Sequence, residues 1–259
     1  MATLVTFHAH PDDEAIACGG TIVKAVRDGH RVVLVVATKG ENGEVDDGFL
    51  DPEETLWERR VLETEAAAKI LGIHRVEFLG YFDSGMMGTP QNDEPGSFWT
   101  ADVEAAAQKL AEILREENAD ILTVYDDNGS YGHPDHIQVH RVGIRAAELA
   151  GTPKVFEVVI DKDELTRSME KMAEMGMGLS DDMDISNMGV PSEVITTRVD
   201  AKPFLDVKRA AMAAHASQIS ETSFFLAMLP KYFEEAFGTE PYVLRGAPDG
   251  FTSNDLFSP

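Results

Sequence analysis

The stretch LVTFHAHPDDEAIACGG, residues 4–20, places a dense group of charges directly after an apolar run. Its first residues have the apolar and β-branched character of a buried strand, which we predict over 4–10. Positions 8–14 hold two histidines and three consecutive acids, and a helical pattern follows over 14–29. A strand that leads through a polar turn into a helix is the first unit of an alternating α/β fold. The charge at the strand end therefore marks a candidate site.

Strands and helices alternate through the first 160 residues. Apolar runs predict further strands at 30–40, 75–81, 119–127 and 154–160, separated by helices at 52–72, 100–118 and 134–151. Near-continuous apolar strands are typical of a parallel sheet that is covered on both faces. We therefore predict a Rossmann-like, doubly wound, mostly parallel α/β sheet with the strand order 3-2-1-4-5. In that order the loops after the first and fourth strands diverge and open a crevice at the carboxyl ends of the strands.

Residues 161–259 have a less regular pattern. We expect residues 1–160 to form a metal-binding catalytic core, and 161–259 to be an α+β extension of the same domain that completes the sheet and roofs the crevice. Helices are expected at 161–176, 204–219 and 223–238, and a strand at 192–200. The methionines between positions 169 and 188 fit either a substrate lid or a helix face packed into the core.

The charge of the chain excludes several classes of partner. The 259 residues include 22 basic and 46 acidic side chains, so the formal net charge is −24, which disfavours nucleic acids and anionic membranes. No apolar run approaches the ~20 residues of a membrane span, and the opening MATLVTF lacks the basic region of a signal peptide.

The single cysteine, Cys18, excludes an internal disulfide and fits a cytoplasmic protein. The oligomeric state stays open, with a homodimer or a homohexamer among the options.

Histidines gather in the two loops that the predicted strand order brings together. Four of the eight histidines lie in these loops: His8, His10, His133 and His136. Two imidazoles and one carboxylate are a common catalytic zinc set that leaves a position open for water. We therefore predict His10, Asp13 and His136 as ligands of Zn²⁺, with Fe²⁺ or another divalent metal as the alternative. A bound cation would also offset the repulsion among the clustered acids.

The other polar residues of these loops predict an amide-hydrolysing mechanism. Asp12 lies between two predicted ligands, where a carboxylate could take a proton from water as general base. His133 could donate to a developing oxyanion or to the leaving amine, and Asp135 could orient it. Tyr131 is a further candidate donor to the oxyanion.

Individual residues also allow structural interpretations. Asp12 or Asp13 could cap the helix that follows. His136 and His140 are four positions apart, which is a second zinc-type spacing, although that site would leave the first loop without a role. His8 alternates with its neighbour along the strand, so it either supports the ligands or is a buried, hydrogen-bonded histidine.

Two other classes of function compete with the hydrolase. His10, Asp12 and His136 would satisfy the facial triad of an Fe(II) oxygenase, but such triads usually occupy an all-β fold. A non-catalytic sugar-binding module could keep the same fold, yet the presence of Asp12 and His133 beside a full ligand set argues against it. Nucleotide-binding domains and serine hydrolases are disfavoured because G-x-G-x-x-G does not follow the first strand and G-x-S-x-G does not occur.

Two motifs together resemble one known family. AHPDDE (9–14) with GHPDH (132–136) is similar to the LmbE-like, or PIG-L, zinc-dependent N-acetylglucosaminyl deacetylases. Further similar stretches run along most of the chain, and the last three of them resemble the mycothiol-pathway members: GENG (40–43), RVLE (60–63), DSGM (83–86) and AHASQ (214–218).

The resemblance implies a metal-dependent amidohydrolase acting on linear amides. It would remove an N-acetyl or N-acyl group from a small amino-sugar conjugate and release acetate and a free amine. The resemblance implies the same ligands and catalytic residues as above, and it implies substrate contacts for Arg60 and Asp83. Glu41, Met86 and His215 lie in the similar motifs and are further candidate contacts. A mycothiol S-conjugate amidase and an antibiotic-pathway deacylase are alternatives on the same site.

Overall fold

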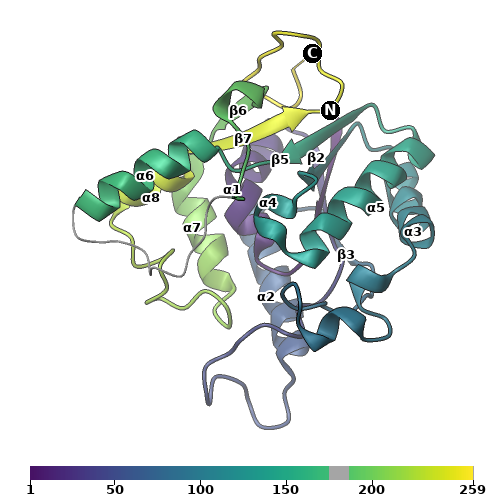
Figure 1. Cartoon of the computed structure of the whole chain (residues 1–259), viewed down its shortest axis with the longest axis vertical. Helices are drawn as coiled ribbons and strands as arrows, with labels where there is room; N and C mark the ends of the chain where they lie inside the picture. Colours follow the sequence, from purple (N-terminus) through teal and green to yellow (C-terminus); the bar gives the residue numbers. More distant parts are fainter. Residues whose placement is uncertain (175–186, 259) are drawn as a thin grey trace.

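A computed structural model describes residues 1–174 and 187–258 of the chain, which form an α/β fold around one seven-stranded sheet (Figure 1). The strands lie in the order β3-β2-β1-β4-β5-β7-β6, which confirms the predicted order 3-2-1-4-5. The first five strands pair in parallel, whereas β7 pairs antiparallel with β5 and with β6. The strands are β1 Thr3–His8, β2 Arg31–Val36, β3 Arg75–Phe78, β4 Ile121–Tyr125, β5 Lys154–Val158, β6 Thr197–Asp200 and β7 Thr239–Leu244.

Helices cover both faces of the sheet. One layer contains α1, α2 and α7, which pack on one another, and the other contains α3 and α5 (Figure 1). The α-helices are α1 Asp13–Arg27, α2 Leu56–Leu71, α3 Val103–Glu116, α4 Gly129–Gly132, α5 Pro134–Ala150, α6 Lys162–Glu174, α7 Leu205–Ala214 and α8 Pro230–Phe237. Short 3₁₀ helices occupy Pro90–Asp93, Phe98–Thr100, Ser192–Val194 and Lys202–Phe204.

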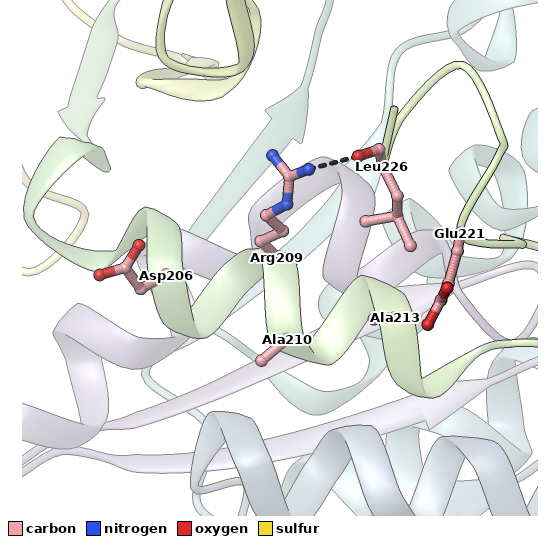
Figure 2. Close-up of a pocket in the computed structure, with 6 residues that line it drawn as sticks. All are labelled: Asp206, Arg209, Ala210, Ala213, Glu221 and Leu226. Atoms are coloured by element: carbon pink, nitrogen blue, oxygen red, sulfur yellow. Dashed lines mark hydrogen bonds between the residues drawn. The ribbon is translucent and has the colours of Figure 1, made fainter. Parts of the chain in front are cut away.

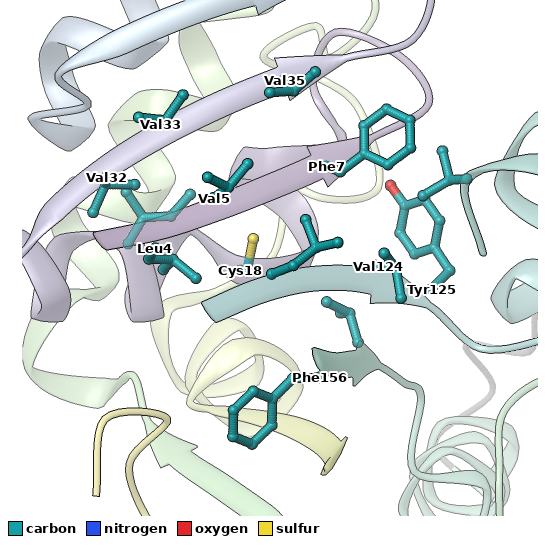
Figure 3. Close-up of a cluster of buried hydrophobic side chains, with 14 of the residues drawn as sticks. Leu4, Val5, Phe7, Cys18, Val32, Val33, Val35, Val124, Tyr125 and Phe156 are labelled. Atoms are coloured by element: carbon teal, nitrogen blue, oxygen red, sulfur yellow. The ribbon is translucent and has the colours of Figure 1, made fainter. Parts of the chain in front are cut away.

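The central strands are buried because both of their faces are covered. All six residues of β1 and all five of β4 are buried. Their apolar side chains, with those of β2, form the core shown in Figure 3, in which Phe7, Val35 and Val124 are labelled. Removing this apolar surface from water stabilises the sheet, and a rigid sheet fixes the ends of β1 and β4, where the two histidine-rich loops begin.

A side chain of strand β7 accepts hydrogen bonds from the backbone of helix α1. The backbone of α1 leaves the helical region at Cys18, with φ −142° and ψ 21°. After this break, the N–H groups of Gly20 and Thr21 donate to the carboxylate of Glu240 on β7, at 2.8 and 2.7 Å. The Nζ atom of Lys208 on α7 lies 2.6 Å from the same carboxylate, and both side chains are fully buried. Three segments that are distant in the sequence are therefore held at one point.

The C-terminal part differs most from the sequence prediction. The sequence predicts one helix over 223–238, but α8 begins only at Pro230, because a proline inside a helix would remove a hydrogen bond and clash with the preceding turn. The helix predicted over 204–219 ends at Ala214. Strand β7 is not predicted from the sequence, since it is short and contains Pro241. The extension completes the sheet, as expected, but it does so with two antiparallel strands.

Two expectations about the second half of the chain are not tested by the described residues. The methionine-rich stretch 169–188 lies largely outside the described residues, and α6 contains its first part. The division of the chain at residue 160 stays a prediction. Within residues 1–174 and 187–258, no helix has both the length and the apolar character that crossing a membrane requires.

Candidate active site

The loops after β1 and β4 meet because these strands are neighbours in the sheet. The ring centroids of His10 and His133 are 4.7 Å apart, and His136 lies 5.4 Å from His10 and 5.3 Å from His133. All three side chains are buried. The topology thus brings together the histidines that the sequence places in two separate motifs.

One carboxylate oxygen links two of these rings. Oδ2 of Asp13 lies 3.5 Å from Nδ1 of His10 and 3.4 Å from Nε2 of His136. Zinc binds nitrogen and oxygen at about 2.0–2.2 Å in tetrahedral sites, so neighbouring ligand atoms are separated by about 3.3–3.5 Å. The two distances from Asp13 match this separation and the donors suit a divalent cation, so we retain His10, Asp13 and His136 as the candidate ligands.

Among the described residues, two groups of side chains have ligand atoms that all lie within 4.8 Å of one another, and Asp13 belongs to neither. They are His10 with His133 and His136, and His10 with Asp83 and Asp135. The second group contacts the opposite nitrogen of His10, because Nε2 lies 3.1 Å from Asp135 and 3.6 Å from Asp83. A carboxylate on the far nitrogen is the usual support of a metal-binding histidine. This geometry favours Asp135 and Asp83 as supports of His10.

The structure changes the expected partner of Asp135. The sequence predicts that its carboxylate orients His133, but the carboxylate contacts His10 and accepts from the backbone N–H of Ser84 at 2.9 Å. The hydroxyl of Ser84 also donates to it. The backbone N–H of Asp135 donates to Nδ1 of His133 at 3.1 Å. Asp135 therefore orients His133 through its main chain and His10 through its side chain.

His133 and Tyr131 face the site as neutral hydrogen-bond donors. Burial, together with the nearby charges of His10 and His136, lowers the pKa of His133 to about 4. Because Nδ1 of His133 accepts a hydrogen bond, its neutral ring carries the proton on Nε2. Burial and then the charge of Asp13 raise the pKa of Tyr131, so its hydroxyl stays protonated. That hydroxyl lies 3.4 Å from Nε2 of His136.

The two adjacent aspartates have opposite acidities. Burial raises the pKa of Asp12 to about 6, and the guanidinium of Arg60, at 3.3 Å, only partly opposes this effect. Burial would also raise the pKa of Asp13, but the charge of His136 and hydrogen bonds with both imidazoles hold it well below its usual range. Asp13 is thus a permanent anion, while Asp12 can exchange a proton near neutral pH.

The backbone at Asp12 is held in a strained conformation. Its φ of 100° is in the region that disfavours residues with a side chain. Its N–H donates to the Glu14 carboxylate at 3.1 Å, and the other oxygen of Glu14 lies 2.7 Å from Nε2 of His215. The predicted substrate contact His215 is fully buried in this pair, so it supports the loop instead.

Arg60 also has a different environment from the one expected. It is buried, and its guanidinium donates to the carbonyl oxygens of Pro11 and Gly40 at 2.5 and 2.9 Å. With its contact to Asp12, this arrangement ties the first loop to the end of β2. We therefore revise its expected role from substrate contact to support of Asp12.

The remaining candidate contacts lie on two loops that are joined to each other. The N–H of Asp83 donates to the Glu41 carboxylate at 3.1 Å, and the N–H of Asn42 donates to Asp83 at 3.2 Å. Burial would raise the pKa of Asp83, but the charge of His10 holds it below its usual range. Met86 is 52% exposed, so its side chain is free to contact a substrate.

Sequence reasoning missed the residues that support the site. Ser84 lies inside the DSGM stretch, but nothing local shows that it faces Asp135. Glu14 belongs to the acidic run, yet its partner is 201 positions away. Tyr125 ends a buried strand and stacks on His136, with ring centroids 4.2 Å apart. These contacts depend on the tertiary fold.

An open cavity of about 380 Å³ lies elsewhere, beside α7 (Figure 2). Its lining consists of Asp206, Arg209, Ala210, Ala213, Glu221 and Leu226. The Arg209 guanidinium donates to the carbonyl oxygen of Leu226 across it. None of the predicted site residues lines this cavity, so it is not the candidate active site.

Comparisons with known proteins identify the family to which this chain is similar. The family described as PIG-L, GlcNAc-PI de-N-acetylase, matches residues 5–147. A curated relative from Acidothermus cellulolyticus is named 1D-myo-inositol 2-acetamido-2-deoxy-alpha-D-glucopyranoside deacetylase. It is 41% identical to this chain over an alignment of 278 positions, which covers 100% of this chain and 95% of that protein. Similarity at this level extends well beyond the two histidine motifs.

Solved structures of low sequence identity share the fold. The N,N'-diacetylchitobiose deacetylase of Pyrococcus horikoshii has a TM-score of 0.59 at 22% identity, covering 93% of this chain and 83% of that one. A 4-carboxy-2-hydroxymuconate hydratase of Pseudomonas putida has a TM-score of 0.57 at 19% identity, covering 96% and 98%. The fold alone therefore does not specify the reaction.

The family match and the full-length similarity do specify the class of reaction. They confirm the predicted resemblance and the prediction of an enzyme that removes an N-acetyl group from an N-acetylglucosamine-type conjugate. The chain belongs to the PIG-L family of GlcNAc-PI de-N-acetylases.

Proposed function

We propose that the protein removes the acetyl group from an N-acetylglucosamine linked to inositol and releases acetate and a free amine. The 41% identical relative that matches the whole chain carries this activity in its name. The observation that carries the mechanism is the Asp13 oxygen that lies between His10 and His136, with Asp12 next to it in the chain. We place the activity in the cytoplasm, as the single cysteine suggests.

A divalent metal ion, for which we propose zinc with ferrous iron as the alternative, would be held by His10, Asp13 and His136. A bound zinc ion supplies Lewis-acid polarisation of an amide carbonyl and a lowered water pKa, about 7 instead of 15.7. Asp135 and Asp83 would keep the ring of His10 in place through its Nε2 atom.

Asp12 is the proposed general base and, later, the general acid. With a pKa of about 6 it is ionised at neutral pH and can accept a proton from the attacking water. His133 is neutral, and its one ring hydrogen is on Nε2. Because the neutral ring is a weak acid, we assign delivery of the proton to the leaving amine to Asp12.

His133 and Tyr131 are the proposed donors to the oxyanion. Both are neutral and protonated at the atoms that face the site, so they can hydrogen-bond to the oxygen of the acetyl group as it gains negative charge. A preorganised donor of this kind contributes on the order of 10²–10³ in rate.

The substrate would extend toward the loops at 41–42 and 83–86. Glu41 offers a carboxylate oxygen to sugar and inositol hydroxyls, and the exposed Met86 offers an apolar contact to a ring face. Asp83 is buried and engaged by His10 and Asn42, so its proposed role is to support this end of the site. A polyol substrate suits the Glu41 acceptor, because each hydroxyl can donate a hydrogen bond.

The test is release of primary amine by the zinc-loaded enzyme from four acetamido substrates. They are the inositol conjugate of N-acetylglucosamine, free N-acetylglucosamine, N,N'-diacetylchitobiose and a mycothiol-type S-conjugate. We expect the inositol conjugate to react fastest, a chelator to abolish release, and the Asp12→Ala enzyme to serve as the control for contaminating activity. Faster release from the S-conjugate would assign the amidase activity instead, and no release from any substrate would contradict the proposal.

A further inference from the structure

The two candidate histidine ligands are supported in different ways. A metal-binding histidine usually donates a hydrogen bond from its second ring N–H to a carboxylate, a carbonyl or a water, which fixes the ring plane. His10 follows this rule, because its Nε2 atom contacts Asp135. Nδ1 of His136 is buried and has no hydrogen-bond partner among the described residues. No described protein group therefore fixes the plane of this ring through a hydrogen bond at Nδ1.

Tyr125 lies flat against His136. The ring centroids are 4.2 Å apart and the planes differ by only 11°, which is a stacked contact. Tyr125 is 2% exposed and lies at the carboxyl end of β4, with its hydroxyl directed toward the end of β1 (Figure 3). A buried ring on a central strand is a rigid surface, so it restricts rotation of the imidazole stacked on it.

A chain of buried hydrogen bonds fixes Tyr125 in turn. Its hydroxyl lies 2.8 Å from Nδ1 of His8, whose Nε2 lies 2.6 Å from the Thr6 hydroxyl. The Thr123 hydroxyl donates to Thr6 at 2.9 Å, and the Sγ atom of Cys18 lies 3.3 Å from Nε2 of His8, so the His8 ring is enclosed by polar partners. Both nitrogens of His8 are used, which explains why this histidine is not a candidate ligand.

We propose that Tyr125, anchored by His8, is the positioning residue that holds the imidazole of His136 in the plane needed for metal binding. The inference rests on the proposed metal site. Stacking on Tyr125 takes the place of the missing hydrogen bond to Nδ1 of His136. The polar residues of β1 and β4 thereby stabilise a site that lies beyond the ends of both strands.

Zinc affinity, measured by competition with a chromogenic chelator, tests this inference without using activity. Tyr125→Leu removes the stacked ring, and we expect zinc binding to weaken by about 10- to 100-fold, the usual cost of losing such a support. Tyr125→Phe keeps the ring but loses its anchor, so its affinity should lie between those of Tyr125→Leu and the wild type. Tyr242→Phe is the matched control, because it removes another buried hydroxyl, bonded to Thr21 at 2.7 Å, and should leave zinc affinity unchanged.

Two further measurements separate positioning from general loss of stability. The visible spectrum of the cobalt-substituted protein should change in both Tyr125 variants and not in Tyr242→Phe. His8→Leu should weaken zinc binding as much as Tyr125→Phe does. The variant that carries both changes should bind zinc as tightly as each single variant, because His8 acts through Tyr125.

Equal zinc affinity in the wild type and both Tyr125 variants would overturn the inference. If Tyr125→Leu does not fold, equal affinity in Tyr125→Phe and the wild type overturns it. A wild-type protein that binds no zinc or ferrous iron would overturn the proposed metal site together with this inference.

Discussion

The tripeptide His-Pro-Asp occurs twice at the site, at 10–12 and at 133–135, and its two copies have different roles. In the first copy the helix begins at residue 13, so Asp12 is the N-cap and takes a φ of 100°. In the second copy the helix begins at Pro134, so His133 is the N-cap. A shift of two positions relative to the helix start changes which side chain of the motif faces the proposed metal site. The position of the motif on its helix, more than its letters, determines the role of each residue.

The two copies also support each other. The aspartate of the second copy, Asp135, contacts the histidine of the first, His10. Burial acts on both copies with opposite results, because it raises the pKa of Asp12 to about 6 and lowers that of His133 to about 4. Burial always favours the neutral form, so the acid becomes a better base and the imidazole becomes a neutral donor.

Removing the histidine of the first copy should have the largest effect. His10→Ala deletes a proposed ligand, so we expect loss of bound metal and loss of measurable amine release. Metal content after gel filtration, beside amine release, measures both. His133→Ala is the matched control at the equivalent position and should keep its metal. Equal metal loss in the two variants would show that both copies supply ligands.

The aspartate of the first copy should have the next largest effect. Asp12→Ala should keep its metal and lose about 10²–10⁴-fold in kcat, the usual contribution of a general acid–base residue. Alanine keeps a Cβ at this residue, whose φ is 100°, whereas glycine adopts such a φ without strain, so Asp12→Gly should be at least as stable as the wild type in urea unfolding. Near-normal turnover in Asp12→Ala would assign the base to another residue.

His133→Ala should be active but slower. We expect kcat to fall by about 10²–10³ with little change in KM, because the Nε2–H donor would act mainly in the transition state. Steady-state kinetics with the best substrate of the panel measures this split. A rise in KM with unchanged kcat would indicate a role in ground-state binding.

Asp135→Asn tests the contact between the copies. The amide keeps the backbone N–H to His133 but weakens the support of His10, so zinc affinity should fall by about 10- to 100-fold. Activity at saturating zinc should be reduced much less than in Asp12→Ala. Competition with a chelator measures the zinc affinity. An unchanged zinc affinity would show that Asp135 does not support His10 and acts only through its contacts with His133 and Ser84.

The smallest expected effect is the pH dependence. Asp12 accepts a proton only when ionised, so kcat/KM should fall as pH drops through about 6, by about tenfold per pH unit below that value. His133 is neutral above about pH 4, so it should add no second fall in kcat/KM between pH 4 and 6. The guanidinium of Arg60 lowers the pKa of Asp12. Arg60→Met removes it, so the fall of kcat/KM should begin at a higher pH. An acid limb near pH 4 would contradict the assignment of Asp12.

The sequence predicts the parts of this molecule that depend on local pattern. The apolar runs of β1, β2 and β4 identify the central strands, and alternation with helices indicates a parallel, doubly wound sheet, for which 3-2-1-4-5 is a common order. The ends of these strands then locate the two loops. His10, Asp13 and His136 could be grouped because the loops that carry them follow neighbouring strands.

The parts that the sequence does not predict depend on contacts between distant segments. The partners of Asp135, Glu14 and Arg60 belong to other loops, so their roles are visible only in the folded chain. Strand β7 contains Pro241 and has no partner nearby in the sequence, and its place between β5 and β6 is a tertiary feature. The apolar residues before Pro230 resemble a helix, but the proline sets the helix start.

The carboxylate of Glu240 accepts from the main chain of α1 more than two hundred residues earlier. Synthesis of the chain on the ribosome runs from the N-terminus, so α1 emerges long before Glu240 does. Until β7 is made, the N–H groups after the break in α1 lack their acceptor, and the nascent helix is incomplete next to the loop that carries Asp12 and Asp13. Helix α1 is synthesised before β7, and it therefore gains its full set of hydrogen bonds only after β7 has been made.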